Sequence, residues 1–218
     1  APYIWHCSCM SDFDRLAYNR DLQREERGHR NEITIPSIVN PKRRQSCEND
    51  LVEYAITYFS DGWCYAPFGK MHIEIFRDFE YAIKYGEIHA VVGPRGHGKD
   101  TICKIAAMWA ISYGHSRFFV YSCFKEEEAE IRVSDIKQQF EINPKLYEDF
   151  PEICAPVRAL ERASQRARQQ KHNGEFTRMQ WTSTLVFPSI EGSKCSGSII
   201  RPASLSGSIR GSLIYGGR

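Results

Sequence analysis

The sequence of 218 residues lacks several features that would assign it to a class at once. It contains no run of about 18 apolar residues, so no segment is predicted to span a bilayer. The 29 Lys and Arg residues are nearly balanced by 27 Asp and Glu residues. This balance excludes a whole-molecule positive field strong enough to bind nucleic acid, but it is compatible with a local basic patch. The first residues have neither the basic start nor the apolar stretch of a secretory signal. We therefore expect a soluble, intracellular protein.

The eight cysteines include no C-x-x-C pair, which excludes a zinc ribbon and a thioredoxin-type motif. Cys103 and Cys123 lie in apolar runs and are expected to be free, buried thiols. His6, Cys7 and Cys9 could supply three metal ligands, but the spacing identifies no fourth ligand. Reduced thiols are therefore the favoured interpretation.

The sequence does contain enough apolar material for a core, since 42% of its residues are hydrophobic and 12% are aromatic. Residues 11–32 differ from the rest because they are dense in charges of both signs. They predict a solvated helix that begins after Ser11 and ends near Gly28. We expect a charged N-terminal arm at 1–45 and a globular domain at 46–218. The last residues resemble a loop, so we expect this domain to be incomplete.

The globular part alternates between helical and strand patterns of apolar residues. Helices are predicted at 47–60, 70–85, 99–113, 125–140 and 157–172. Buried strands are predicted at 88–92 and 118–121, a hairpin at 177–181 and 184–187, and further strands and turns at 196–211. The order strand, helix, strand, helix predicts an α/β fold, in which a mostly parallel sheet is flanked by helices and preceded by a helical arm.

One motif carries chemistry: residues 93–101 follow a predicted strand and open a predicted helix, as a phosphate-binding P-loop must. Its glycines let the backbone wrap closely, so that N–H groups point at phosphate oxygens, and the positive end of the following helix adds to that field. Lys99 would reach the β- and γ-phosphates as a mobile charge. The alternative is a glycine-rich turn that happens to contain a lysine. The candidate nucleotide-binding residues are Gly93, Pro94, Arg95, Gly96, His97, Gly98, Lys99, Asp100 and Thr101.

The motif departs from the pattern G-x-x-x-x-G-K-S/T at its last position. Asp100 stands where a Ser or Thr hydroxyl should hold Mg²⁺, and a carboxylate there could either coordinate the ion or repel the phosphates. Thr101 comes one residue later and is rotated by about 100° on a helix. Either residue is a candidate magnesium ligand, and efficient hydrolysis is predicted less strongly than phosphate binding.

Arginines supply further candidates. Arg95 could stabilise charge on the γ-phosphate in the transition state, which would make it a catalytic residue beside Lys99, or it could be a loop arginine in a salt bridge. Arg158, Arg162 and Arg166 share one face of a predicted helix. Such a stripe could follow a DNA backbone or contact a subunit, or it could be a solvated helix face.

Taken in order along the chain, these residues resemble the N-terminal ATPase region of the large terminase subunit of tailed bacteriophages, the motor that pumps DNA into empty capsids. Residues Pro94–Lys99 resemble the Walker A motif of that family. The resemblance covers about residues 46–218, and the ordered set of blocks is more specific than any one block. The other blocks are Cys47–Leu51, Tyr65–Phe68, Met71–His72, Trp109–Ala110, Tyr113–His115, Asp149–Cys154, Arg158–Glu161, Ser196–Ile200 and Gly207–Gly211.

The resemblance implies a P-loop NTPase of the additional-strand class that uses ATP and Mg²⁺. ATP would lie between the loop and a helical lead-in near Phe68 and His72, and its hydrolysis would drive double-stranded DNA through a portal ring. The acidic Walker B residues and the nuclease domain of the family would follow residue 218, so this piece is expected to bind nucleotide without hydrolysing it. Arg210 lies in the last of the resembling blocks and joins the arginine stripe as a candidate contact to DNA or to a subunit.

The partners implied by the resemblance are the portal ring, the small terminase subunit and further copies of the chain in a homo-oligomeric ring. Packaging would take place in the host cytoplasm at the procapsid portal, with no role for a membrane. Two other interpretations stay open. The chain could be another P-loop NTPase, such as a helicase-like remodeller, or a nucleotide-binding structural component that has lost turnover through Asp100.

Overall fold

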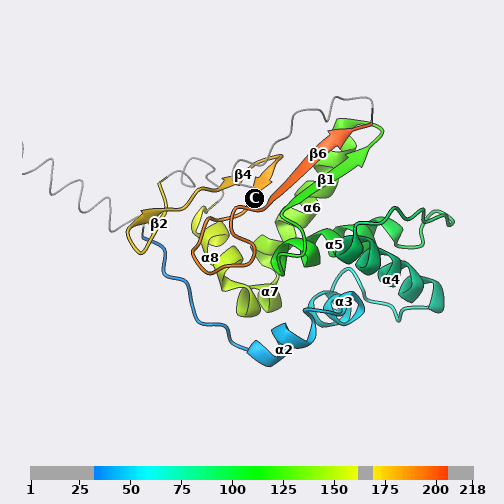
Figure 1. Ribbon diagram of the computed structural model, residues 1–218, viewed down its shortest axis with the longest axis horizontal. Coiled ribbons are helices and arrows are strands. Elements are labelled where there is room, and N and C mark those ends of the chain that lie inside the picture. Colours follow the sequence, from blue (N-terminus) through cyan, green and yellow to red (C-terminus); the bar gives the residue numbers. More distant parts are fainter. Residues whose placement is uncertain (1–31, 162–168, 206–218) are drawn as a thin grey trace, which may run out of the picture.

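The computed structural model describes residues 32–161 and 169–205, which form a mixed α/β structure (Figure 1). The helices are α2 (Pro41–Ser46), α3 (Leu51–Phe59), α4 (Lys70–Tyr85), α5 (Lys99–Ser112), α6 (Glu126–Ile142), α7 (Pro144–Asp149) and α8 (Pro151–Ala159). The strands are β1 (Phe118–Cys123), β2 (Lys171–His172), β3 (Glu175–Phe176), β4 (Gln180–Trp181), β5 (Leu185–Val186) and β6 (Ile199–Ser204). Across these residues, no helix has the length and apolar character needed to cross a membrane.

Helices α4, α5 and α6 begin and end within two residues of the predicted bounds, whereas α3 begins four residues later than predicted. α3 starts after Asp50, whose side chain accepts a hydrogen bond from the N–H of Glu53 at 2.9 Å. α4 ends at Gly86, whose φ of 73° lies in the left-handed region that favours glycine. α5 follows the loop directly, and most of its side chains from Ile102 onward are buried. The loop is therefore attached to a helix that the core holds on nearly all sides.

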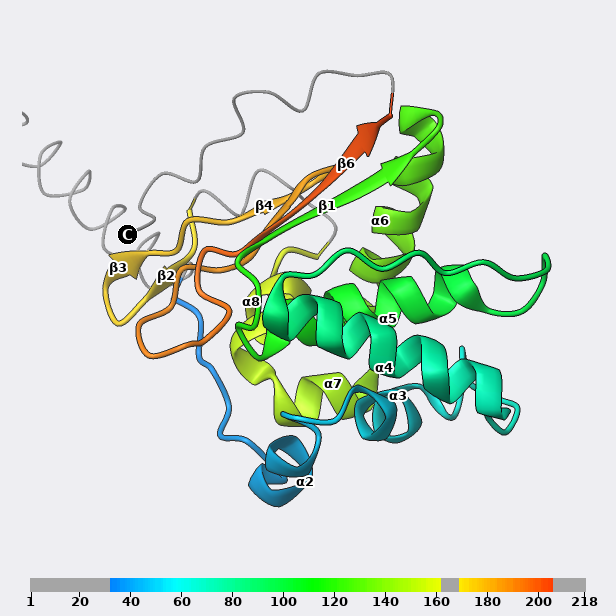
Figure 2. The ribbon, with the colours of Figure 1, turned by 45° about the vertical axis from the view of Figure 1, so that its right-hand side comes forward.

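The sheet has the strand order β1-β6-β5-β4 and is mixed, which corrects the expectation of a mostly parallel sheet. Among the described strands, β1 and β6 are parallel, with Phe118 opposite Ile199, whereas β5 is antiparallel to both β6 and β4. The predicted hairpin explains the antiparallel half, because a turn as short as the one between β4 and β5 can join only antiparallel strands. α6 packs against β1 and β6, and α5 lies next to β1 (Figure 2).

The predicted buried strand at 88–92 is wrong. The chain between α4 and α5 is extended but forms no strand, and Ile88 and Val92 are fully exposed. An apolar run becomes a strand only where a neighbouring strand receives its backbone hydrogen bonds, and the described residues place no strand beside this one. The segment instead connects two parallel helices, α4 and α5, by running back along them to the start of α5 (Figure 2).

The predicted basic helix at 157–172 is also wrong at both ends. α8 ends at Ala159, and Glu161 has a positive φ of 46°, which is incompatible with a continuing helix. Lys171 and His172 form strand β2, which pairs with β3. Residues 162–168 between these ends lie outside the described part of the chain.

One hydrophobic core joins the helices to the sheet. Trp109 of α5, Phe140 of α6 and Phe187 after β5 are fully buried, and Phe140 packs edge-on against Phe187 with ring centroids 5.3 Å apart. The Trp109 indole N–H donates to the carbonyl of Cys47 at 2.9 Å, which fixes α5 to the chain before α3. The described cysteines are free thiols, but Cys103 and Cys123, which were expected to be buried, are only partly buried.

The segment before α3 is held on the outside of this core. The N–H of Ile33 donates to the carbonyl of Lys171 at 2.8 Å. In α2, Arg43 binds the carboxylate of Asp149 at 2.6 Å, and Arg44 binds that of Glu152 at 2.6 Å. Arg43 and Arg44, which precede position 45, are thus fastened to α7 and α8. The helix predicted at 11–28 lies outside the described residues.

Candidate functional site

The candidate loop, residues 93–98, lies at the N-terminal end of α5. It opens a helix as predicted, but the segment before it is not a strand, so only the helical half of the predicted strand–loop–helix context is present in the described structure. Gly96 and Gly98 have φ values of 82° and 66°. These values are costly for residues with a Cβ, so the two glycines allow the chain to turn sharply into the helix. α4 and α5 run side by side in the same direction, so the N-terminal end of α4 lies at the same end of the molecule as the loop (Figure 2).

The backbone N–H groups of residues 95–101 form a run of donors without acceptors. Within the described structure none of them makes a hydrogen bond, and the first N–H of α5 that does so is that of Ile102, which donates to the carbonyl of Gly98 at 2.9 Å. The first N–H groups of any helix lack intrahelical partners, and here the glycine-rich loop extends that set. Donors without partners at the positive end of a helix favour an anionic ligand.

Lys99 is folded over the loop. Its ammonium group donates to the carbonyl of Gly93 at 2.7 Å and to that of Pro94. A Cβ added to Gly93 would lie 3.6 Å from the Lys99 Nζ, so the lysine side chain packs directly on the backbone of this glycine. The positive charge is thus held against the loop by neutral acceptors, which an anion can replace.

The other loop side chains are exposed and lightly held. Arg95 is exposed, and its guanidinium has no ion pair within the described residues, so the salt bridge considered as its alternative role is not formed there. A ring nitrogen of His97, Nδ1, lies 3.2 Å from the Arg95 carbonyl oxygen. The Arg95 side chain is therefore available to a ligand bound at the loop.

Asp100 is turned towards β1 and α6. Its Oδ1 accepts hydrogen bonds from the Tyr121 hydroxyl at 2.7 Å and from the Arg132 Nε at 3.2 Å, and its Oδ2 lies 3.4 Å from the Lys104 ammonium. Burial alone would raise the pKa of Asp100, but the Tyr121 hydrogen bond and the charges of Lys104 and Arg132 outweigh burial and lower it. Asp100 is thus an ionised carboxylate with partners on both oxygens. Thr101 makes no side-chain hydrogen bond in the part of the chain that the structure describes.

The two residues proposed for the adenine side lie at the start of α4. The Phe68 ring packs against that of Phe76, 5.0 Å away, at the edge of the core. The Nδ1 of His72 accepts a hydrogen bond from the N–H of Gly69 at 3.0 Å, so this histidine caps its own helix. Neither side chain is joined to residues 93–101 by a hydrogen bond or a ring contact in the described structure.

Of the arginines proposed to contact DNA or a subunit, the structure places only Arg158. Its guanidinium lies over the Tyr147 ring, 4.1 Å from the centroid, and donates to the Asn143 carbonyl at 3.1 Å. These contacts fasten α8 to α7 and use the group internally. Arg162, Arg166 and Arg210 lie outside the described residues, as do His6, Cys7 and Cys9.

Sequence reasoning missed the partners of Asp100. Lys104 could have been found, because it stands four residues after Asp100 and therefore on the same face of α5. Tyr121 and Arg132 come from other elements, and no local pattern pointed to them.

Among the described residues, no group of three or more His, Cys, Asp or Glu side chains could hold a metal ion.

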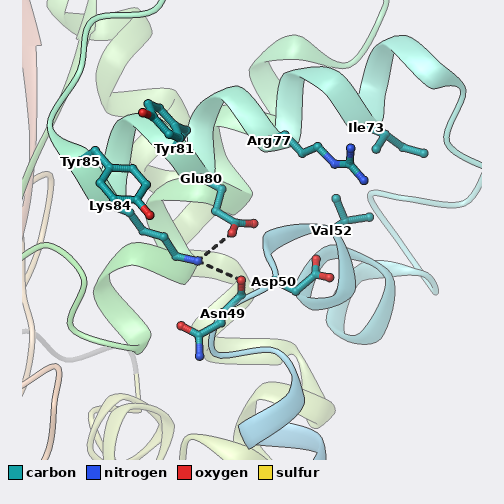
Figure 3. Close-up of a pocket in the computed structure, with 9 residues that line it drawn as sticks. All are labelled: Asn49, Asp50, Val52, Ile73, Arg77, Glu80, Tyr81, Lys84 and Tyr85. Atoms are coloured by element: carbon teal, nitrogen blue, oxygen red, sulfur yellow. Dashed lines mark hydrogen bonds and ion pairs between the residues drawn. The ribbon is translucent and has the colours of Figure 1, made fainter.

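A separate hollow of about 570 Å³ lies between α3 and α4 (Figure 3). Lys84 crosses it, donating to the Asn49 carbonyl at 2.9 Å and to the Glu80 carboxylate at 2.7 Å, while Glu80 accepts the N–H of Leu51 at 3.1 Å. No residue of 93–101 lines this hollow. Its polar groups serve mainly to join the two helices, and we assign it no part in the candidate site.

Comparison of the chain with known protein families, with curated proteins and with solved structures gave no match.

Proposed function

We propose that this chain is the nucleotide-binding part of a P-loop motor ATPase, similar to the large terminase subunit, that couples ATP hydrolysis to movement of double-stranded DNA into a procapsid. The observation that carries nucleotide binding is the run of unpaired N–H groups at 95–101, together with the Lys99 ammonium at the start of a buried helix. DNA translocation, the portal ring, the small subunit and a ring of copies are supported by the sequence resemblance alone.

In this proposal the chain recognises the phosphates of ATP, whose bond between the β- and γ-phosphates supplies the energy for the motor. The N–H groups of residues 95–101 donate to phosphate oxygens, and the dipole of α5 adds to the attraction. Lys99 exchanges its two carbonyl acceptors for phosphate oxygens. Arg95 is exposed in the same loop and can place a second cation on the terminal phosphate. Phe68 and His72, at the same end of the molecule, are the candidates for the adenine side.

The proposal is tested by calorimetric titration of the chain with ATP. Lys99→Ala should weaken binding by on the order of tenfold to a hundredfold, because a charge-assisted contact to phosphate is lost. Lys42→Ala is the matched control, since Lys42 is exposed on α2 and has no contact with the loop. Absence of saturable binding, or equal affinity in the wild type and Lys99→Ala, would refute nucleotide binding at this loop.

A second candidate function is a nucleotide-binding structural component without turnover. The observation that favours it is the engagement of Asp100 with Tyr121, Arg132 and Lys104, which removes the magnesium position of the motif from use. Release of phosphate from ATP, measured with double-stranded DNA present in the complete protein, separates the two candidates. Turnover excludes the structural component, whereas turnover that appears only with Asp100→Thr supports it.

A further inference from the structure

The carboxylate of Asp100 joins three elements of the fold. Asp100 belongs to the first turn of α5, Tyr121 to β1 and Arg132 to α6. Both Tyr121 and Arg132 donate to the same oxygen of Asp100, at 2.7 and 3.2 Å, and the Lys104 ammonium faces the other oxygen. Although the Asp100 side chain is 46% exposed, each of its oxygens already has a partner.

The two cations of this cluster are themselves held in place. Lys104, only 10% exposed, donates to the Asp135 carboxylate at 2.8 Å and lies over the Trp63 ring, 4.8 Å from its centroid. Arg132 also donates to the carbonyl of Glu128 at 3.4 Å, in the preceding turn of α6. The carboxylates of Asp100 and Asp135 therefore balance the charges of Lys104 and Arg132 within the cluster.

This arrangement does not fit a magnesium ligand at Asp100. Mg²⁺ requires oxygen ligands at about 2.0–2.1 Å in an octahedral arrangement. Binding the ion through Oδ1 would break the contacts of that oxygen to Tyr121 and Arg132, and binding it through Oδ2 would displace the Lys104 ammonium. In either case, Lys104 and Arg132 would repel a divalent ion placed beside this carboxylate. The Ser or Thr hydroxyl that usually occupies this position is uncharged, so Lys104 and Arg132 would not hold it in this way.

We infer that this loop binds the phosphates of a nucleotide without a divalent cation, and that Asp100 is a positioning residue that ties α5 to β1 and α6. The inference rests on the proposed function and specifies that the nucleotide binds as the metal-free anion. The charge that a metal would neutralise is met by Lys99, by Arg95 and by the unpaired N–H groups of 95–101. Because Lys104 and Arg132 pair with Asp100, the negative charge of this carboxylate repels neighbouring phosphates less than a free carboxylate would.

The first test is calorimetric titration of the wild-type chain with ATP, once with excess Mg²⁺ and once with excess EDTA. We expect the two dissociation constants to agree within about threefold. Tighter binding in Mg²⁺ by more than this factor would overturn the inference while leaving nucleotide binding in place. If ATP binds in neither buffer, the inference and the proposed function fail together.

Two substitutions at Asp100 then test its role. Asp100→Asn removes a negative charge near the phosphates and releases Lys104 and Arg132, so ATP should bind about threefold to tenfold more tightly in EDTA. A metal-ligand role for Asp100 makes the opposite prediction, a loss of affinity in Mg²⁺. Asp100→Thr restores the usual hydroxyl of the motif and should make the affinity depend on Mg²⁺.

Asp135→Asn is the matched control, because it removes the same charge and also loses a contact to Lys104, but it lies on α6. We expect its effect on ATP affinity to be smaller than that of Asp100→Asn. An equal gain would assign the effect to net charge and overturn the role given to Asp100. Circular dichroism of each variant establishes that the change in affinity does not come from unfolding.

Discussion

A single buried carboxylate, Asp149, fastens the N-terminal segment to the core. Its side chain is fully buried and accepts hydrogen bonds from the Arg43 guanidinium at 2.6 and 2.9 Å and from the Tyr58 hydroxyl at 2.6 Å. Asp149→Ala should destabilise the fold by about 3–5 kcal/mol, because it leaves a partly buried arginine and a buried hydroxyl without their acceptor. Urea unfolding measures this loss. The control is Glu148→Gln, since Glu148 pairs with the same arginine at a more exposed position and should cost at most about 1 kcal/mol. Equal effects of the two substitutions would contradict this account.

At the scale of the element, the segment between α4 and α5 differs from every helix and strand around it. The backbone N–H groups of residues 87–92 have no acceptor within the described structure, whereas β1 is paired along its length with β6. In native-state hydrogen exchange followed by mass spectrometry, peptides from 87–92 should exchange at close to the rate of an unfolded chain. Peptides from β1 should be protected and serve as the internal control. Strong protection of 87–92 would show that these groups acquire a partner in solution.

The same element marks the limit of what local sequence predicts. α4 and α6 were predicted because their apolar residues follow helical spacing and each end carries a stop or start signal, such as Gly86. An apolar run such as 88–92 carries no information about which strand lies beside it, so its prediction as a strand failed. The loop at 93–98 could be found because its glycines and Lys99 are contiguous in sequence. The cluster around Asp100 could not, since Tyr121 and Arg132 come from elements that only the fold brings to it.

At the scale of the whole molecule, the candidate loop is exposed but is attached directly to the core through α5. α5 begins at the loop, and its buried side chains, Trp109 among them, lie in one continuous cluster with residues of α3, α6, α8 and the sheet. Because this core is continuous, we expect the described residues to unfold in one cooperative transition. A ligand that binds the folded loop must then stabilise this whole unit, because the loop cannot be lost separately from α5.

This coupling gives a prediction that joins the site to the fold. At a hundredfold excess of ATP over its dissociation constant, the free energy of unfolding should rise by about 2.7 kcal/mol. For a chain of this length the midpoint temperature should then rise by about 5–10 °C. Far-ultraviolet circular dichroism follows the helices. Among the described residues, Trp109 and Trp181 of the core and the partly buried Trp63 contribute to tryptophan fluorescence, so both signals should shift by the same amount. At the same ATP concentration, Lys99→Ala should keep the single transition but reduce the gain in the free energy of unfolding to about 0.4–1.4 kcal/mol, because its weaker binding leaves only a one- to tenfold excess over its dissociation constant. A shift seen by only one of the two signals would place the ligand on a part that unfolds independently of the core, and α5 would then not be the element that carries the site.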